Sequence, residues 1–369
     1  MKATLVVAVL APFTVALASV DDAVKSITEV QREGSGNAGA ASAWDDVVRA
    51  GPSALTVVLA ASGQGNIVAD NWLRVAAGAI VENSLSAHKP LPLDELEAFV
   101  RDTKHAGPAR QLAFDLIAKA DVKRATKIES SLANDPVQEL RRGAVQRLIE
   151  SAKAKQGEAA KTAYLEALEA VRDEDQTRVI VAALKEFDVP VDLPAHFGFL
   201  MDWQVIGPFD NAGRLGFDTV FPPETEIDLQ ATYPGKTEPV KWQEFVSHDD
   251  YGKIDLNQPL GMLKEATAYA VTTINAPEDR DAELRLGCKN AWKIWLNGEL
   301  LFSRDEYHRL QQMDQFKLKC RLKKGVNTVL VKCCQNEQKE EWTVEWEFQL
   351  RLCDSTGTAI PSRNSTASQ

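Results

Sequence analysis

The chain lacks the short motifs that mark many soluble enzyme families. Its five histidines are scattered, with no H-E-x-x-H sequence and no pair at i, i+4 spacing, which excludes a helical zinc site of the metalloprotease type. No serine stands in a G-x-S-x-G sequence, and no glycine-rich loop precedes a Lys-Ser or Lys-Thr pair. These absences exclude the common esterase and phosphate-loop signatures. We therefore expect a protein that is not an enzyme and that needs no cofactor for a reaction.

Positive charge is also in short supply. The chain has 42 Lys and Arg against 53 Asp and Glu, a formal net charge of −11. Nucleic-acid phosphates attract clustered Lys and Arg, and so do anionic membrane surfaces. We therefore expect no nucleic-acid partner. Beyond the N-terminus no apolar run is long enough for a transmembrane helix, so we expect no membrane insertion after signal removal.

The first eighteen residues have the pattern of a secretory signal peptide. Lys2 supplies the charged start, Leu5–Val15 the apolar core, and Ala16-Leu17-Ala18 an A-x-A cleavage site. The apolar core is too short to span a bilayer. The pattern predicts an exported protein, whether periplasmic, secreted or on the cell surface, and a retained N-terminal anchor is the alternative.

Cysteine is absent before residue 288. The five cysteines are Cys288, Cys320, Cys333, Cys334 and Cys353. In an oxidising compartment one or two disulfides are expected, and the odd count leaves at least one thiol over. The alternative is that all five are small buried side chains without a disulfide. No C-x-x-C pair is present and the spacing matches no zinc module.

Residues 44–190 show helical periodicity. Within 135–150, apolar residues recur at i, i+3, i+4 and i+7 spacing, with Asp135 as the expected N-cap and Pro136 in the first turn. The sequence D-P-V-x-x-L-R-R-x-A-V-x-x-L-I resembles the second half of a HEAT repeat. This resemblance implies a short, irregular α-solenoid, and a plain helical bundle is the alternative. The small, polar residues before it lead us to expect a linker at 19–43.

Pro190 and Pro194 end the helical pattern, and short β-rich runs cut by glycine and proline follow. The segment Glu341–Leu352 alternates strictly between apolar and polar residues, which predicts a long, half-buried antiparallel strand. Many short strands without intervening helices favour a β-sandwich or jelly roll. The expected fold is thus multidomain α and β, with the sandwich at 199–354 and a disordered tail at 355–369.

The most distinctive part of the β-rich region contains two glycine turns. Asn297-Gly298 separates two apolar runs and predicts a type I′ hairpin, and Lys324-Gly325 precedes the apolar run Val329-Leu330-Val331. This order, W-L-N-G-E and then K-K-G-V-N-T-V-L-V, resembles the jelly-roll sugar-binding domain of family 2 glycoside hydrolases and related galactose-binding-like modules. The resemblance covers roughly residues 201–353. It implies a sandwich that accompanies a catalytic barrel rather than performing catalysis, with a glycan as the implied partner.

The candidate ligand patch follows the predicted hairpin. If Trp292, Ile294 and Leu296 point inward, Trp295 points to the other face, and a polar loop comes soon after it. Sugar sites combine aromatic faces with charged and amide side chains. The candidates are Trp295, Arg304, Asp305, Tyr307 and His308. The alternative is that Trp295 packs against the second layer of the sandwich or the helical domain, and that the loop is a solvated turn.

A second candidate site is the acidic loop at 248–255. Galactose-binding-like modules often carry a structural calcium ion, which loop carboxylates and backbone carbonyls hold. The resemblance makes Asp249, Asp250 and Asp255 the candidate ligands. An ordinary solvated turn is the alternative.

Three functions are compatible with these features. The first is an exported, non-catalytic binding protein whose sandwich recognises a carbohydrate or cell-surface polymer, with the helical domain as scaffold. The second is a scaffolding protein that binds a protein partner through its helical surface. The third is an accessory subunit or degenerate member of a glycoside hydrolase system, which would need a catalytic partner encoded elsewhere. Two carboxylates facing each other in a deep pocket would favour this third function. Solvent exposure of Trp295 and Tyr307 would distinguish the first two.

Overall fold

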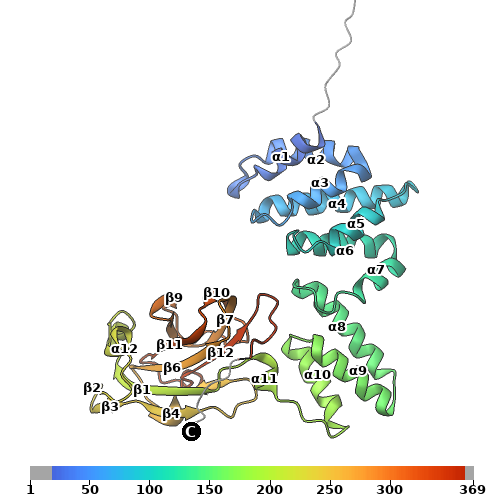
Figure 1. Ribbon diagram of the computed structural model, residues 1–369. Coiled ribbons are helices and arrows are strands. Elements are labelled where there is room, and N and C mark those ends of the chain that lie inside the picture. Colours follow the sequence, from blue (N-terminus) through green and yellow to red (C-terminus); the bar gives the residue numbers. More distant parts are fainter. Residues whose placement is uncertain (1–18, 362–369) are drawn as a thin grey trace, which may run out of the picture. The chain divides into compact units, whose positions relative to one another are not determined.

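The computed structural model describes residues 19–361 of the chain, so the predicted signal peptide and the last eight residues of the tail lie outside the described residues (Figure 1). The chain forms two compact units, Met1–Arg147 and Leu148–Gln369. The first is helical, and the second holds further helices followed by antiparallel sheets. Helix gives way to strand between α11 (Leu193–Phe197) and β1 (Asp202–Asp210), whereas the units divide earlier, within α8 (Gln138–Lys153). Within residues 19–361, every helix is too short or too polar to span a membrane.

The first unit is a series of helices that pack in consecutive pairs. The contacts run α1 with α2, α3 with α4, and α5 with α6, while α2, α4 and α6 contact one another in turn. Stacked helical pairs of this kind are typical of an α-solenoid. A true HEAT repeat stays a prediction. The helices are α1 (Val20–Thr28), α2 (Asn37–Ala50), α3 (Leu55–Ala61), α4 (Ile67–Ser86), α5 (Leu93–Arg101), α6 (Gly107–Ala120) and α7 (Val122–Glu129).

Residues 19–43 differ from the expected linker, because they form α1 and the first half of α2. The Ser19 hydroxyl caps α1 by accepting from the backbone N–H of Asp22 at 3.2 Å. Ile27 of α1 and Ala40 of α2 are fully buried in the helical core. The small residues that resemble a linker in composition therefore allow two helices to approach closely.

A buried ion pair joins α6 to the turn before α8. Arg110 donates from Nη1 to Asp135 Oδ1 at 2.9 Å and from Nη2 to Oδ2 at 2.5 Å, and the two side chains are only 1% and 5% exposed. Asp135 also accepts from the backbone N–H of Val137 at 2.9 Å. The Asp135 carboxylate thus binds Arg110 and also fixes the turn before α8. Helix α8 begins at Gln138, two residues later than the expected start at Pro136.

The second unit contains a β-sandwich of two antiparallel sheets. The six-stranded sheet has the order β4-β1-β6-β11-β8-β9, and the four-stranded sheet has the order β10-β7-β12-β5. Trp203, Trp292, Trp346 and Phe348 are buried between them. The remaining strands of the sandwich are β4 (Gln243–Val246), β5 (Lys253–Asp255), β6 (Ala266–Ala276), β7 (Arg280–Cys288), β8 (Ala291–Leu296), β9 (Glu299–Arg304), β10 (Phe316–Leu322), β11 (Gly325–Gln335) and β12 (Glu347–Cys353).

Further elements accompany the sandwich in this unit. Asn297 and Gly298 join β8 to β9 with positive φ angles of 53° and 82°, so the predicted type I′ hairpin is confirmed. A small two-stranded sheet lies between β1 and β4 in sequence. These elements are α9 (Gly157–Ala170), α10 (Glu174–Lys185), α12 (Pro222–Thr225), α13 (Asn257–Leu260), β2 (Thr232–Pro234) and β3 (Pro239–Lys241).

Two boundaries near the C-terminus differ from expectation. The strand expected from Glu341 begins only at Glu347, because the backbone carbonyls of residues 343–345 accept from the buried Gln335 amide instead of joining a ladder. The tail, expected to be disordered from residue 355, remains packed as far as Pro361. Ile360 is buried and donates its backbone N–H to Leu352 O at 3.1 Å. Burial of Ile360 therefore acts together with tail hydrogen bonds, such as that from Arg351 Nη1 to Gly357 O at 3.0 Å, to dock the segment.

Two cysteines face each other between the sheets, and all five cysteines are free thiols. Cys288 of β7 and Cys333 of β11 are buried with their Sγ atoms 3.9 Å apart, across a sequence separation of 45 residues. We expect refolding in a buffer of oxidised and reduced glutathione to yield a Cys288–Cys333 disulfide. A loop of this length predicts a gain of about 4 kcal/mol in the free energy of unfolding.

Peptide mapping of the non-reduced protein measures this linkage, and urea unfolding measures the gain. Because burial raises the pKa of the Cys333 thiol well above its ordinary value, native protein placed in the same buffer should oxidise far more slowly than unfolded protein. Cys320→Ser, at a half-buried thiol elsewhere, should leave the linkage intact. Recovery of Cys288 and Cys333 as free thiols after oxidative refolding would contradict the prediction.

Candidate functional site

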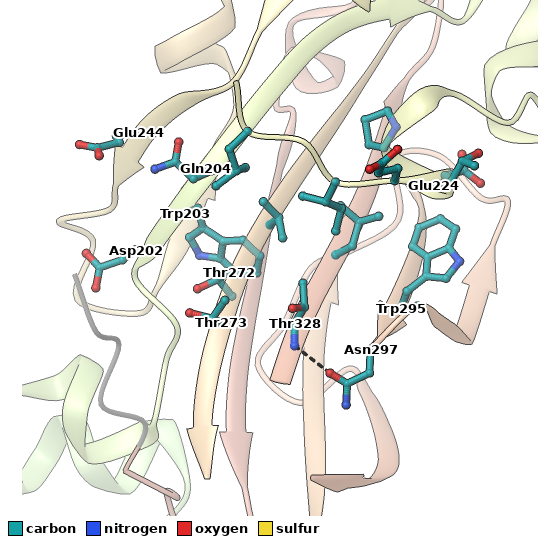
Figure 2. A pocket seen from close by; sticks show the side chains of 18 of the residues that line it. Asp202, Trp203, Gln204, Glu224, Glu244, Thr272, Thr273, Trp295, Asn297 and Thr328 are labelled. Atoms are coloured by element: carbon teal, nitrogen blue, oxygen red, sulfur yellow. Dashed lines mark hydrogen bonds between the residues drawn. The ribbon is translucent and has the colours of Figure 1, made fainter. Parts of the chain in front are cut away.

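A groove of about 990 Å³ lies on the face of the six-stranded sheet that points away from the four-stranded sheet (Figure 2). Strands β4, β1, β6, β11 and β8 supply its floor, residues 223–229 in and after α12 form a wall, and the Asn297-Gly298 turn contributes at the end of β8. The lining residues are Asp202, Trp203, Gln204, Pro223, Glu224, Thr225, Glu226, Ile227, Leu229, Glu244, Val246, Val271, Thr272, Thr273, Trp295, Asn297, Gly298, Thr328 and Leu330.

The floor of the groove is a row of residues in register across five strands. Glu244 pairs with Gln204, Gln204 with Val271, Val271 with Leu330, and Leu330 with Trp295. Neighbouring strands are about 4.8 Å apart, so this row spans about 19 Å across the sheet. The groove is therefore shaped for an elongated ligand that crosses the strands.

Further polar side chains lie on the same face of the sheet, each two residues along its strand from a member of this row. Asp202 pairs with Val246, Thr273 pairs with Thr328, and Asn297 Oδ1 accepts from the backbone N–H of Thr328 at 2.9 Å. Figure 2 shows Asp202, Gln204 and Glu244 at one end of the groove, Glu224 and Trp295 at the other, and the threonines between them. Hydroxyl, amide and carboxylate groups thus border an apolar centre.

Trp295 lines the groove but presents little of its indole. The side chain is only 8% exposed, because it packs on the outer face of the sheet with Ile206, Tyr269 and Leu330. This packing differs from both expected environments, since the ring is neither an exposed shelf nor part of the core between the sheets. Trp295 therefore supports one end of the groove and leaves little of its ring open to a ligand.

The other residues of the predicted patch do not line the groove. Arg304 Nη2 donates to Glu306 at 2.7 Å, and its guanidinium lies 5.0 Å from the centre of the Phe316 ring. Asp305 is adjacent in the same loop. The structure therefore separates Trp295 from this loop rather than bringing the five candidates together.

Tyr307 and His308 are held by their own neighbours. The Tyr307 hydroxyl accepts from Asn211 Nδ2 at 3.2 Å, and burial raises the pKa of this phenol. His308 Nε2 lies 2.7 Å from Asn336 Oδ1, and burial lowers the pKa of the imidazole. The His308 ring stands edge-on to Trp342, which is 61% exposed. Both predicted residues are half-buried, and the exposed aromatic beside them was not among the candidates.

The acidic loop does not gather its carboxylates around a common point. Asp249 Oδ1 accepts from the backbone N–H groups of Tyr251 and Lys253, and Asp255 Oδ1 accepts from that of Asn257. Within residues 19–361 no group of three or more His, Cys, Asp or Glu side chains is arranged to hold a metal ion. Asp249, Asp250 and Asp255 are thus not assembled as a calcium site, since at least two of them instead fix turns in their own chain segment.

One wall of the groove is fixed by a buried cation. Lys332 of β11 is fully buried and donates from Nζ to Glu224 Oε1 at 2.8 Å, and to the backbone oxygens of Phe217 at 3.0 Å and Thr219 at 2.8 Å. The Tyr269 hydroxyl donates to the same Glu224 oxygen. Burial lowers the pKa of Lys332, against the opposing effect of Glu224, and burial raises the pKa of Tyr269. These bonds hold the segment before and within α12 against the sheet.

Two signals in the sequence point to this site. Lys332 interrupts the apolar run V-L-V-K-C-C, where a charge needs a buried partner. In β1, alternation that turns Trp203 inward turns Asp202 and Gln204 outward. Nothing in the sequence indicates that Glu244 would lie opposite Gln204, because that register depends on the path of the 32 residues, 211–242, between β1 and β4.

No family model matches the chain, and no curated protein sequence matches it. Similar solved structures include a β-glucosidase from Kluyveromyces marxianus in complex with glucose, with 13% identity, 43% of this chain and 17% of that chain covered, and a TM-score of 0.26. An anti-sigma factor domain-containing protein from Clostridium clariflavum is 12% identical, with 45% of this chain and 46% of that chain covered and a TM-score of 0.26. The GH31 α-xylosidase from Xanthomonas citri is 12% identical, with 31% of this chain and 15% of that chain covered and a TM-score of 0.20. The similarity to these glycoside hydrolases is weak, and this chain spans less than half of each structure.

Proposed function

We propose that this protein is an exported, non-catalytic binding protein whose β-sandwich holds a carbohydrate in the groove of Figure 2, with the helical unit as scaffold. The observation that carries the proposal is the floor of the groove, a row across five strands in which polar Glu244 and Gln204 adjoin the apolar side chains of Val271, Leu330 and Trp295. A sugar ring has the same division, with hydroxyl groups at its edge and C–H groups on its faces.

The chemistry of the groove supports this proposal. Gln204 offers an amide donor and acceptor, and the Thr273 hydroxyl can do either. Asn297 already accepts from the backbone N–H of Thr328 and donates to Asn327 Oδ1 at 2.9 Å, so it borders the groove mainly as a fixed part of the turn.

Val271 and Leu330 at the centre of the row are only 5% and 4% exposed, whereas Val246 and Leu229 in the lining are 48% and 45% exposed and can cover the apolar face of a ring. A volume of about 990 Å³ is at the upper end of the range for ligand sites. Several rings of a glycan chain therefore fit better than a single sugar.

The test is affinity electrophoresis of residues 19–369 through gels that contain different soluble polysaccharides. We expect retardation by one class of glycan, and about tenfold weaker binding for Gln204→Ala, since losing a side chain that makes one or two hydrogen bonds costs about 1.4 kcal/mol. Gln230→Ala is the matched control, because Gln230 is an exposed amide that does not line the groove. Equal retardation of both variants would place the ligand elsewhere.

Absence of retardation by every glycan would overturn the proposal. It would favour the second function, in which the helical surface binds a protein partner and the sandwich is a packed accessory.

A further inference from the structure

We infer that the groove selects a glycan with free amino groups, that is, a polymer of cationic amino sugars. This inference rests on the proposed function and names its ligand class. It follows from the charge of the lining, the length of the floor and the kind of surface that the floor presents.

The lining is acidic. Asp202, Glu224, Glu226 and Glu244 contribute carboxylates, and none of the described residues that line the groove is Lys, Arg or His. Lys332 reaches Glu224 from beneath, so that one carboxylate is already compensated. Glu226 and Glu244 are exposed, and neither side chain makes a hydrogen bond or ion pair with another residue in the range 19–361. An anionic glycan would be repelled here, whereas an ammonium group would be attracted.

The acidic groups stand at both ends of the apolar floor. Glu244 begins the row on β4, while Figure 2 shows Glu224 of α12 at the Trp295 end. Glu226 follows α12 directly in the chain and also lines the groove. The row from β4 to β8 spans about 19 Å. A small cation cannot contact both ends, but a chain of rings with an amino group on each ring can.

The floor is suited to a glycan better than to a basic peptide. An extended peptide binds a sheet through the backbone groups of an unpaired edge strand. Here β1, β6, β11 and β8 each pair with a neighbour on both sides, so these four strands present only their side chains to a ligand, and the unpaired edge among the floor strands is that of β4 at one end of the groove. A ligand that crosses the strands along the row therefore meets side chains over most of its length, and sugar hydroxyls there would meet Gln204 and Thr273.

The test is calorimetric titration of the full mature chain with three oligosaccharides of equal length. They are β-1,4-linked glucosamine, the same oligomer with every amine acetylated, and a β-1,4-linked glucose oligomer. At low ionic strength we expect the glucosamine oligomer to bind about tenfold more tightly than the acetylated one, which corresponds to two exposed ion pairs. This advantage should shrink several-fold at high salt, because exposed charges are screened.

Variants of the exposed carboxylates assign the effect to this groove. Glu244→Gln and Glu226→Gln should each reduce the preference for the free amine and leave the affinity for the glucose oligomer unchanged. Glu278→Gln is the matched control, because Glu278 is exposed and lies outside the groove. These are surface substitutions, and thermal unfolding of each variant will verify that it folds.

The outcomes separate this inference from the proposed function. If glucose and glucosamine oligomers bind equally, selection for amino groups is wrong while carbohydrate binding stands. If no oligosaccharide binds, the proposed function itself fails. If an oligolysine peptide displaces the glucosamine oligomer with equal affinity, the groove recognises charge alone and the inferred glycan class is wrong.

Discussion

Replacing Lys332 with methionine is expected to lower the free energy of unfolding by about 3–5 kcal/mol, because it leaves the Glu224 carboxylate buried without its cation. Methionine keeps most of the apolar stem of lysine, so the change removes charge and hydrogen bonds rather than volume. The Lys332 ammonium also satisfies the backbone oxygens of Phe217 and Thr219, which would lose their donor. Urea unfolding at neutral pH measures the loss.

Two comparisons isolate the cause. Lys319→Met, at an exposed position of β10, should change the free energy of unfolding by less than about 0.5 kcal/mol. The double variant Lys332→Met/Glu224→Gln should be more stable than Lys332→Met alone, because it no longer buries an unpaired carboxylate. Strictly additive losses in the double variant would show that the pair is not coupled.

The same variant bears on the groove. Phe217 and Thr219 precede α12, and Glu224 lies within it, so Lys332 fastens the wall to β11 at three points. Loosening this wall should weaken ligand binding in any variant that still folds. Position 332 therefore connects the stability of the sandwich to the shape of its candidate site.

Local patterns in the sequence were sufficient to predict that a helical region precedes a β-sandwich along the chain. The i, i+3, i+4 spacing at 135–150 predicted helix, and the Asn297-Gly298 pair predicted the β8–β9 hairpin, because both signals act within a few residues. The segment 19–43 was mistaken for a linker because alanine and glycine are common both in linkers and where helices pack closely. Composition alone does not distinguish the two.

The candidate site was harder to predict because its residues come from separated strands. Trp295 was correctly assigned to the face opposite Trp292, and it does line the groove. The residues chosen as its partners were neighbours in sequence, at 304–308, whereas its actual neighbours in the row are Leu330 and Val271. Alternation says which face a residue occupies, but the register between distant strands decides what stands beside it.

The outer face of the four-stranded sheet shows a further limit of alternation. The polar residues of β12 were expected on a solvated face, yet Arg351 is only 1% exposed. Asp314 covers it from the loop before β10, accepting from Arg351 Nε and Nη2 at 2.6 Å each, and from Arg285 Nη1 at 2.6 Å. A polar strand face can therefore be buried when a loop supplies the opposite charge.

This network leads to the last prediction, which concerns acid. Burial by itself would raise the pKa of Asp314, but the hydrogen bonds and charges of Arg351 and Arg285 outweigh it and hold the pKa below its ordinary value. The carboxyl thus has a lower pKa in the folded chain than in the unfolded chain, where it is about 3.9. Its stabilising contribution is complete above the unfolded pKa and is lost as the pH falls from about 4 through the folded pKa.

Asp314→Asn should therefore be about 3–5 kcal/mol less stable than the natural protein at pH 7, because the buried Arg351 guanidinium loses its carboxylate partner and Arg285 keeps only the carboxylate of Glu283, at 2.8 Å. The difference should shrink as the pH falls below about 4, since protonation then removes the same charge from the natural protein. Urea unfolding between pH 7 and pH 2.5 measures both effects. Asp281→Asn is the control, because Asp281 pairs with Arg321 at an exposed surface, where the loss should stay within about 1 kcal/mol.

Parallel stability curves for Asp314→Asn and the natural protein down to the lowest pH would mean that this carboxyl does not govern the acid response. In that case Arg351 would have to be stabilised mainly by the backbone oxygens of Phe197 and Gly357, which accept from it at 3.0 Å, and Arg285 by Glu283.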